Sequence, residues 1–217
     1  MKFVFESEIN KQKLRDIEAV ICPVFIEAGK ILKIGRVADR LEAHDSKFLE
    51  FFLKKTDKKV GGFERLRLTG SPGSVYTVMT AKLELKDFIL MWRKFVRTAK
   101  FDGAKTMGID LDDFVSGRLT AVNLAAIAAQ EGLVAHYDFS EFYKTAPKEG
   151  FRKIGKSVIF SGGEPPSIKA ALRRGVIIGE AINRARTISN YPGGELAPEG
   201  LAEAARELSM KNPEIEV

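Results

Sequence analysis

Cysteine and histidine are scarce in this chain. Its 217 residues include one cysteine, Cys22, and two histidines, His44 and His136. A single cysteine excludes an intrachain disulfide framework and a thiolate cluster for structural zinc. Because apolar residues flank Cys22 on both sides, we predict that it is a small buried hydrophobic side chain. The histidines are far apart and lack paired acidic spacing. We therefore expect His136, at the end of a predicted helix, to have a structural role.

Long apolar runs are also missing. The N-terminal sequence MKFVFESEIN has too short an apolar run for a signal peptide, and no run approaches transmembrane length. We therefore expect a cytoplasmic protein with no membrane partner. The composition, 45% hydrophobic and 29% charged, is that of an ordinary globular domain. The net charge of +6 allows an anionic partner such as nucleic acid but does not require one.

The chain contains no G-x-S-x-G elbow and no H-E-x-x-H motif. Residues 150–157 match the phosphate-loop pattern G-x-x-x-x-G-K-[ST], but that loop needs a helix directly after it. Here residues 158–160 (Val-Ile-Phe) predict a strand, so we interpret the match as a basic loop. Asp110, Asp112 and Asp113 form an acidic group after a strand, where metal sites can occur. Without a further ligand, we interpret this group as a solvated loop. We assign no catalytic, metal-binding or cofactor-binding residue in this chain.

Strand and helix patterns alternate through most of the chain. Alternating or dense apolar runs predict strands at 2–7, 19–26, 63–69, 74–80, 106–111 and 157–161. Helical spacing predicts helices at 37–54, 86–100 and 118–137. Pro23 within the second strand requires an irregular or edge position. Because the early strands have short links, we predict an α/β fold with a mixed sheet flanked by helices.

A long helix is predicted near the end of the chain, with Ser167 as its N-cap after Pro165-Pro166. One face of it carries Ile168, Leu172, Gly175, Gly179, Ile182 and Arg186. Two glycines in a helix interior cost about 1 kcal/mol each, which predicts another element packed closely against them. We expect the helix to break at 190–194 and a second helix to run from Pro198 to Lys211. Residues 213–217 resemble the start of a strand.

The basic stretch 54–59, followed by Arg65 and Arg67, is the strongest electrostatic feature. Clustered lysines can bind phosphates. However, we expect the flanking Phe51, Phe52 and Phe63 to lie in the core rather than to stack on bases. A solvated loop is therefore the favoured interpretation.

Two stretches resemble a known family. Residues 175–186 (GVIIGEAINRAR), followed by Asn190-Tyr191-Pro192 and Pro198, resemble the segment that joins the two domains of leucyl (cytosol) aminopeptidases. Upstream, residues 130–133 (QEGL) and 137–144 (YDFSEFYK) are similar to the family's Glu-Gly…Tyr-x-Phe-Asp-x-Tyr-Lys element, in the expected order and spacing. The chain departs from the family at Thr187, where Asp is usual, and at Gly194, where Asn is usual. Residues 79–82 (MTAK) also replace a Gly-Leu-Gly-Lys turn.

The resemblance implies a macro-domain-like N-terminal domain over 1–165, an interdomain linker helix over 166–192 and a truncated start of the peptidase domain over 193–217. Family members are typically hexamers that release N-terminal amino acids from peptides with two zinc or manganese ions. Their metal ligands lie in V-G-K-G-x-T-F-D-S-G-G and N-T-D-A-E-G-R-L, and neither motif is present. Residues 155–163 mimic the first motif only superficially, upstream of the linker helix.

On this interpretation the chain is an assembly and substrate-access domain that is inactive alone. Its partners would be its own catalytic domain, which would hold the two divalent metals, and further copies in a homo-oligomer. The alternative is a standalone macro-like module that binds nucleic acid or a phosphorylated nucleoside through its basic surface. A plainer possibility is a non-catalytic assembly subunit.

Overall fold

The computed structural model describes residues 1–140, 151–192, 197–211 and 214. Within these residues one mixed sheet of seven strands has the order β1-β7-β6-β2-β5-β4, and β3 pairs with β2 off this path. The strands are β1 (Lys2–Glu6), β2 (Ala19–Glu27), β3 (Lys30–Ile34), β4 (Phe63–Arg67), β5 (Ser74–Thr80), β6 (Thr106–Asp110) and β7 (Lys156–Phe160). The β2–β3 and β4–β5 pairs are antiparallel and the others are parallel. The predicted α/β fold with a mixed sheet flanked by helices is confirmed.

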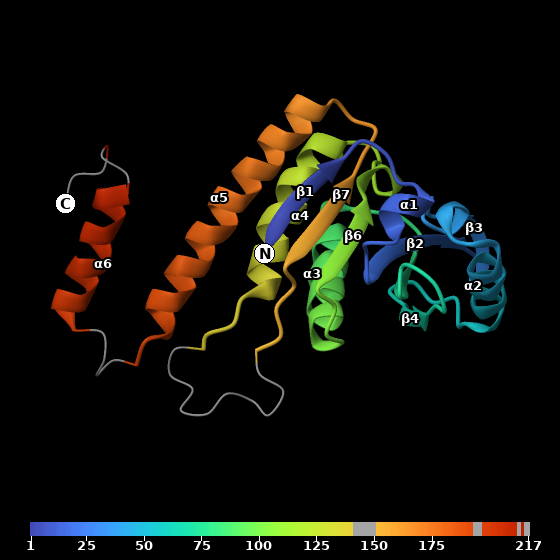
Figure 1. The fold of residues 1–217 in the computed structure, drawn as a ribbon, viewed down its shortest axis with the longest axis horizontal. Helices are drawn as coiled ribbons and strands as arrows, with labels where there is room; N and C mark the ends of the chain where they lie inside the picture. Colours follow the sequence, from blue (N-terminus) through green and yellow to red (C-terminus); the bar gives the residue numbers. More distant parts are fainter. Residues whose placement is uncertain (141–150, 193–196, 212–213, 215–217) are drawn as a thin grey trace.

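Apart from α6, the helices divide between the two faces of the sheet, and each face has its own core. They are α1 (Lys11–Leu14), α2 (Ala43–Lys55), α3 (Leu85–Phe101), α4 (Ala121–His136), α5 (Pro165–Asn190) and α6 (Pro198–Lys211), with 3-10 turns η1 (Ala38–Arg40) and η2 (Leu111–Asp113). Figure 1 shows α5 alongside α4, and α6 standing apart from the sheet. None of the described helices combines the length and apolar character needed to cross a membrane.

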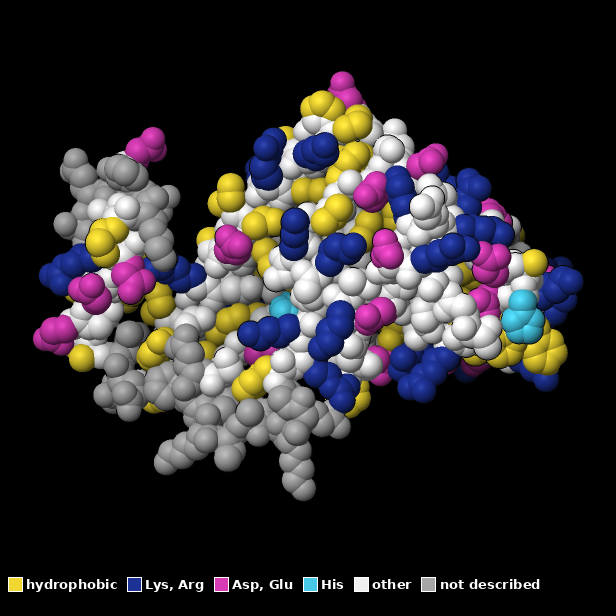
Figure 2. All heavy atoms as spheres, in the orientation of Figure 1, with side chains coloured by type: hydrophobic (Ala, Val, Ile, Leu, Met, Phe, Trp, Pro, Cys, Tyr) yellow, Lys and Arg dark blue, Asp and Glu magenta, His cyan; other side chains and the backbone are white. Residues whose placement is uncertain are grey.

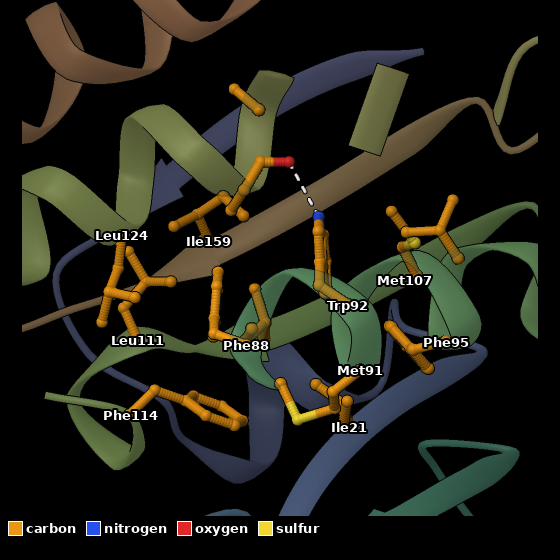
Figure 3. Close-up of a cluster of buried hydrophobic side chains, with 14 of the residues drawn as sticks. Ile21, Phe88, Met91, Trp92, Phe95, Met107, Leu111, Phe114, Leu124 and Ile159 are labelled. Carbon is orange, nitrogen blue, oxygen red and sulfur yellow. Dashed lines mark hydrogen bonds between the residues drawn. The ribbon is translucent and has the colours of Figure 1, made fainter. Parts of the chain in front are cut away.

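The larger core is built on the apolar face of α3. Phe88, Trp92 and Phe95 recur at steps of four and three, so they share one helix face and are fully buried. The indole nitrogen of Trp92 donates to the Ala128 carbonyl oxygen at 2.8 Å, which ties α3 to α4 (Figure 3). Phe88 also packs edge-on against Phe114 with ring centroids 5.5 Å apart. The single tryptophan thus combines a large buried area with a satisfied polar atom.

Pro23 lies inside β2, yet it leaves no ladder partner unsatisfied. On one edge of β2, pairing with β6 covers only Ala19 and Val20, and pairing with β3 begins at Val24. Pro23 falls between these two ladders, and its carbonyl accepts from the Gly35 amide at 2.8 Å. On this edge β2 therefore exchanges β6 for β3 as its neighbour around Pro23. This change of partner strand provides the irregular position that a proline requires within a strand.

Two expectations about local structure are corrected. The segment 37–54 is not one helix, because the chain is extended at Leu41 and Glu42 between η1 and α2. The helix α5 begins at Pro165 with Glu164 as its N-cap, not at Ser167. Its first two residues are prolines, which lack the N–H donors that a cap would satisfy. Ser167 instead donates to the Glu164 carboxylate at 3.1 Å. Sequence patterns also missed β3 and α1, and the expected strand at 213–217 lies outside the described residues apart from Glu214, which is in a turn.

Candidate functional site at the junction of α4 and α5

The two segments that carry the family resemblance lie against each other along α4 and α5. A Cβ atom on Gly175 would lie 2.1 Å from the Ala126 carbonyl oxygen, and one on Gly179 would lie 2.9 Å from the Gln130 carbonyl oxygen. Atoms cannot approach so closely, so only glycine allows the two backbones to touch at these positions. The close neighbour predicted by the two glycines is therefore α4.

Beyond the glycines, α5 supplies hydrogen bonds to the end of α4. The last carbonyl groups of any α-helix have no partner within the helix. The Asn183 side chain donates to the Leu133 carbonyl oxygen at 2.9 Å, and Arg186 donates to that of Val134 at 2.9 Å. On the α3 side, Lys100 donates to the carbonyl oxygen of His136 at 2.8 Å. The C-terminus of α4 is thus capped by side chains from two other helices.

Tyr137 completes the junction. The Arg186 guanidinium lies 4.2 Å from the centroid of the Tyr137 ring, within the range of a cation–π contact. The Tyr137 hydroxyl lies 3.0 Å from the Thr187 hydroxyl and accepts from the Asn190 amide at 3.5 Å. Thr187, where the family usually has Asp, thus keeps a polar contact without a charge.

The Glu-Gly pair upstream ties α4 to its other neighbours. Glu131 is only 4% exposed, and its carboxylate pairs with Nε of Arg93 on α3 at 2.5 Å. A Cβ on Gly132 would lie 3.1 Å from the ring of Phe3 on β1, so glycine permits this packing. Residues 141–144 of the second matched segment, and Gly194 of the first, lie outside the described residues.

Two of the three carboxylates after β6 are buried and the third is partly buried, so the interpretation of this group as a solvated loop is wrong. Asp110 is 0% and Asp113 3% exposed. Arg36 contacts the whole group: its Nη2 lies 2.5 Å from Asp110 Oδ1 and 2.9 Å from Asp112 Oδ2, and its backbone N–H donates to Asp113 at 2.9 Å. Sequence reasoning missed Arg36 because it lies 74 residues before Asp110 and no local pattern marks it.

The carboxylates of this group have different pKa values for identifiable reasons. Burial raises the pKa of Asp113 to about 6 and also raises that of Asp110, although Arg36 opposes both changes. Burial also disfavours the charged form of Asp112. There, hydrogen bonds from Gly162 and Ser161, together with Arg36, outweigh it and lower the pKa.

The position of this group is one where open α/β sheets commonly bind ligands, beyond the carboxyl ends of parallel strands. Asp110 ends β6, and Ser161 and Gly162 follow β7; both donate to Asp112, at 2.7 and 2.8 Å. The chain's own side chains therefore occupy this edge. No three His, Cys, Asp or Glu residues within the described ranges are grouped to hold a metal ion. The group acts as an ionic clamp between β3, β6 and β7.

The remaining candidate residues are separate from one another. His136 has a structural role as predicted: its Nε2 accepts from the Ile154 amide at 2.9 Å, and burial lowers its pKa to about 4. His44 is exposed on α2. The described part of the phosphate-loop match leads directly into β7, as the sequence predicted. Cys22 is fully buried and burial raises its pKa, which confirms the expectation.

The basic stretch 54–59 lies at the surface: Lys54 and Lys55 form the end of α2, and residues 56–59 follow the helix. Phe51, expected in the core, is 53% exposed, with the Lys55 ammonium 4.3 Å from its ring centroid. The reason is that Phe51 lies on the solvent side of α2. Phe52 and Phe63 pack partly buried against the two cores.

One face of α5 is not covered by any part of the chain that the structure describes. A hollow of about 590 Å³ lies beside it, with apolar walls and two basic residues (Phe3, Phe5, Lys169, Leu172, Arg173, Val176 and Ile177). Figure 2 shows hydrophobic surface interrupted by Lys and Arg side chains over this part of the molecule. Ile177 is 68% exposed. At the far end, Arg184 pairs with Glu207 of α6 at 3.2 Å.

The chain is similar in sequence to a known aminopeptidase, and in fold to another aminopeptidase and to a maturation enzyme. No family model matches the chain. It is 32% identical over 116 residues to a probable cytosol aminopeptidase of Solibacter usitatus (strain Ellin6076), covering 54% of this chain and 22% of that protein. A mutant of tomato leucine aminopeptidase has a TM-score of 0.75 at 16% identity, covering 97% of this chain and 42% of that one. The bottromycin maturation enzyme BotP has a TM-score of 0.63 at 18% identity, covering 90% and 37%.

The mixed sheet followed by a long helix is the architecture of leucine aminopeptidase N-terminal regions. In sequence the chain is similar to a cytosol aminopeptidase, and its fold is similar to the N-terminal regions of leucine aminopeptidases. It spans less than half the length of each of these relatives.

Proposed function

We propose that this chain is the N-terminal domain and linker helix of a leucyl-aminopeptidase-family metallopeptidase, which releases N-terminal amino acids from peptides. Residues 1–165 form the macro-like domain, 166–192 the linker helix, and 193–217 belong to the peptidase domain. The chain itself serves assembly and substrate access. The observation that carries this proposal is the α4–α5 junction, in which both family-like segments meet and hydrogen bond.

The chemistry would reside in the catalytic domain. Two divalent ions, zinc or manganese, would polarise the peptide carbonyl and activate a water molecule there. The partners of this chain are then its own catalytic domain and further copies in a homo-oligomer, a hexamer as the family resemblance implies. The resemblance to cytosol aminopeptidases supports a cytoplasmic location.

An aminopeptidase assay of purified residues 1–217 tests whether this chain is inactive without the catalytic domain. We expect no hydrolysis of leucine amide above buffer, with or without added Zn²⁺ or Mn²⁺. Clear metal-dependent turnover would show that a catalytic site lies within this chain. Independently, the transcript downstream of the Val217 codon should encode the two metal motifs. A stop codon directly after Val217 would contradict the proposed domain arrangement.

The alternative of a standalone module for nucleic acid or a phosphorylated nucleoside is not favoured by the comparisons. A titration with duplex DNA distinguishes a nucleic-acid-binding module from the proposed peptidase-family domain. Binding by phosphate contacts should weaken steeply as salt rises. We expect no salt-dependent binding by residues 1–217.

A further inference from the structure

A second hollow lies at the β4 end of the sheet, the opposite end from β1, next to the first half of α3. Its volume is about 270 Å³, close to the lower end of the range of about 300–1,000 Å³ typical of small-molecule sites. The lining residues come from β4, β5, α3 and two loops: Val60, Gly61, Phe63, Val78, Met79, Thr80, Lys82, Leu83, Asp87, Leu90, Met91 and Lys94.

The floor of this pocket is apolar and buried. Val78 and Leu83 are each 6% exposed and Met91 is 8% exposed. Met91 lies on α3 next to the aromatic core, as Figure 3 shows. Leu90 and Val60, in contrast, are 64% and 66% exposed at the pocket. The pocket therefore offers an apolar surface that is open to solvent on one side.

The charges in the pocket are two lysines and one aspartate. Neither Lys82 nor Lys94 makes an ion pair within the described part of the chain, whereas other basic residues of α3 do: Lys86 pairs with Glu84, Arg93 with Glu131 and Lys100 with Asp138. The Lys94 ammonium instead lies 4.7 Å from the centroid of the Phe63 ring.

The aspartate, Asp87, is already engaged in the N-terminal turn of α3. Its carboxylate accepts from the Glu84 amide at 3.1 Å as part of a capping box. The two lysine charges are therefore not neutralised by a dedicated partner, and the pocket has a net positive charge next to apolar walls.

We propose that this pocket binds a small apolar carboxylate, such as a short aliphatic or aromatic acid. The hydrocarbon body would cover the floor formed by Val78, Leu83 and Met91, where burial of apolar area stabilises binding. The carboxylate would face Lys82 and Lys94. A neutral ligand of the same shape would lack this charge pairing, and a cationic one would be repelled. The site is independent of the α4–α5 junction and of the peptidase assignment.

An NMR titration of ¹⁵N-labelled residues 1–217 tests the proposal with three probes of equal chain length: hexanoate, hexanol and hexylamine. We expect hexanoate to shift amides of 60–63 and 78–91 and to bind more tightly than hexanol, with hexylamine weakest. Equal affinity for all three probes, or shifts confined to other regions, would overturn the proposal.

Substitutions in the pocket distinguish the contribution of charge to hexanoate binding from that of pocket shape. The double variant Lys82→Met/Lys94→Met should weaken hexanoate binding about threefold to tenfold, as expected for two solvent-facing ion pairs, and should leave hexanol binding unchanged. Lys86→Met, on the same helix but outside the pocket, is the matched control. At the mouth, Leu90→Asp should weaken hexanoate binding more than the neutral, equally shaped Leu90→Asn. An unchanged affinity in both the double variant and Leu90→Asp would show that charge does not govern the site.

Discussion

The guanidinium of Arg36 lies among three carboxylates, two of which are buried. An interior carboxylate that loses its cation is left without compensation for its desolvation. The Arg36 side chain itself is 43% exposed, so water partly screens the interaction. Removal of the guanidinium should therefore destabilise the protein mainly because the buried carboxylates of Asp110 and Asp113 lose their cation.

We expect Arg36→Met to lower the free energy of unfolding by about 3 kcal/mol, at the lower end of the range for broken buried pairs. Urea denaturation followed by circular dichroism measures this change. The control is Arg40→Met in the exposed turn η1, for which about 0.5 kcal/mol or less is expected. Equal effects of the two substitutions would argue against an ionic clamp.

The same group gives the stability a defined pH dependence. Because the pKa of Asp113 is raised to about 6 in the folded state, the folded protein binds this proton more tightly than the unfolded chain does. The stabilisation from Asp113 is thus present at low pH and is lost as the pH rises through 6. His136, with its pKa lowered to about 4, acts in the opposite direction, since its buried neutral form loses stability as the pH falls.

The contribution of Asp113 is isolated by comparison with Asp113→Asn. The free energy of unfolding of the variant, minus that of the wild type, should increase between pH 4 and pH 7. Urea denaturation at intervals of half a pH unit provides the measurement. A difference that stays constant over this range would show that Asp113 has no raised pKa.

At the scale of elements, the contact between α4 and α5 depends on the absence of side chains. Alanine is the better helix former by about 1 kcal/mol, so an exposed Gly→Ala change would stabilise. At Gly175 the added Cβ would meet the Ala126 backbone at 2.1 Å, and a backbone atom cannot move aside as a flexible side chain can.

We therefore expect Gly175→Ala to destabilise the protein by about 1–3 kcal/mol despite the gain in helix propensity. Thermal unfolding of the variant provides the test, with Arg174→Ala at the adjacent exposed position as the control. A variant as stable as the wild type would mean that the two helices can separate without loss.

Much of the fold followed from the sequence at this scale, for physical reasons. Buried strands such as β2 and β5 are marked by dense apolar runs, and α5 by its periodicity. In contrast, β3 was missed because its residues are all exposed or only partly buried, so it has no apolar pattern. The four-residue helix α1 is too short for a period. The Arg36 clamp and the Arg93–Glu131 pair join residues 74 and 38 positions apart, which single-sequence patterns do not connect.

At the scale of the whole molecule, α6 differs from the other long helices. It stands apart from the sheet (Figure 1), and Leu201 and Met210 are 52% and 73% exposed. Few buried contacts imply a low free energy of local opening.

We expect α6 to be the least protected long helix in hydrogen exchange of residues 1–217, followed by the uncovered face of α5 near Ile177. The buried strands β2, β6 and β7 should be the most protected. Mass spectrometry of peptic peptides gives this ranking, with α3 as an internal reference. Protection in α6 equal to that in α3 would contradict the ranking and would indicate that its exposed face is covered by self-association.

The anchoring of α5 also has a mechanical consequence. The helix has 26 residues and is therefore about 39 Å long, and contacts with α4 hold it from Gly175 to Arg186. Only four residues follow Arg186 before the helix ends at Asn190, a projection of about 6 Å. Because this projection is so short, bending of the free end of α5 would move the residues that follow it only slightly. The helix therefore sets a fixed exit direction rather than serving as a hinge.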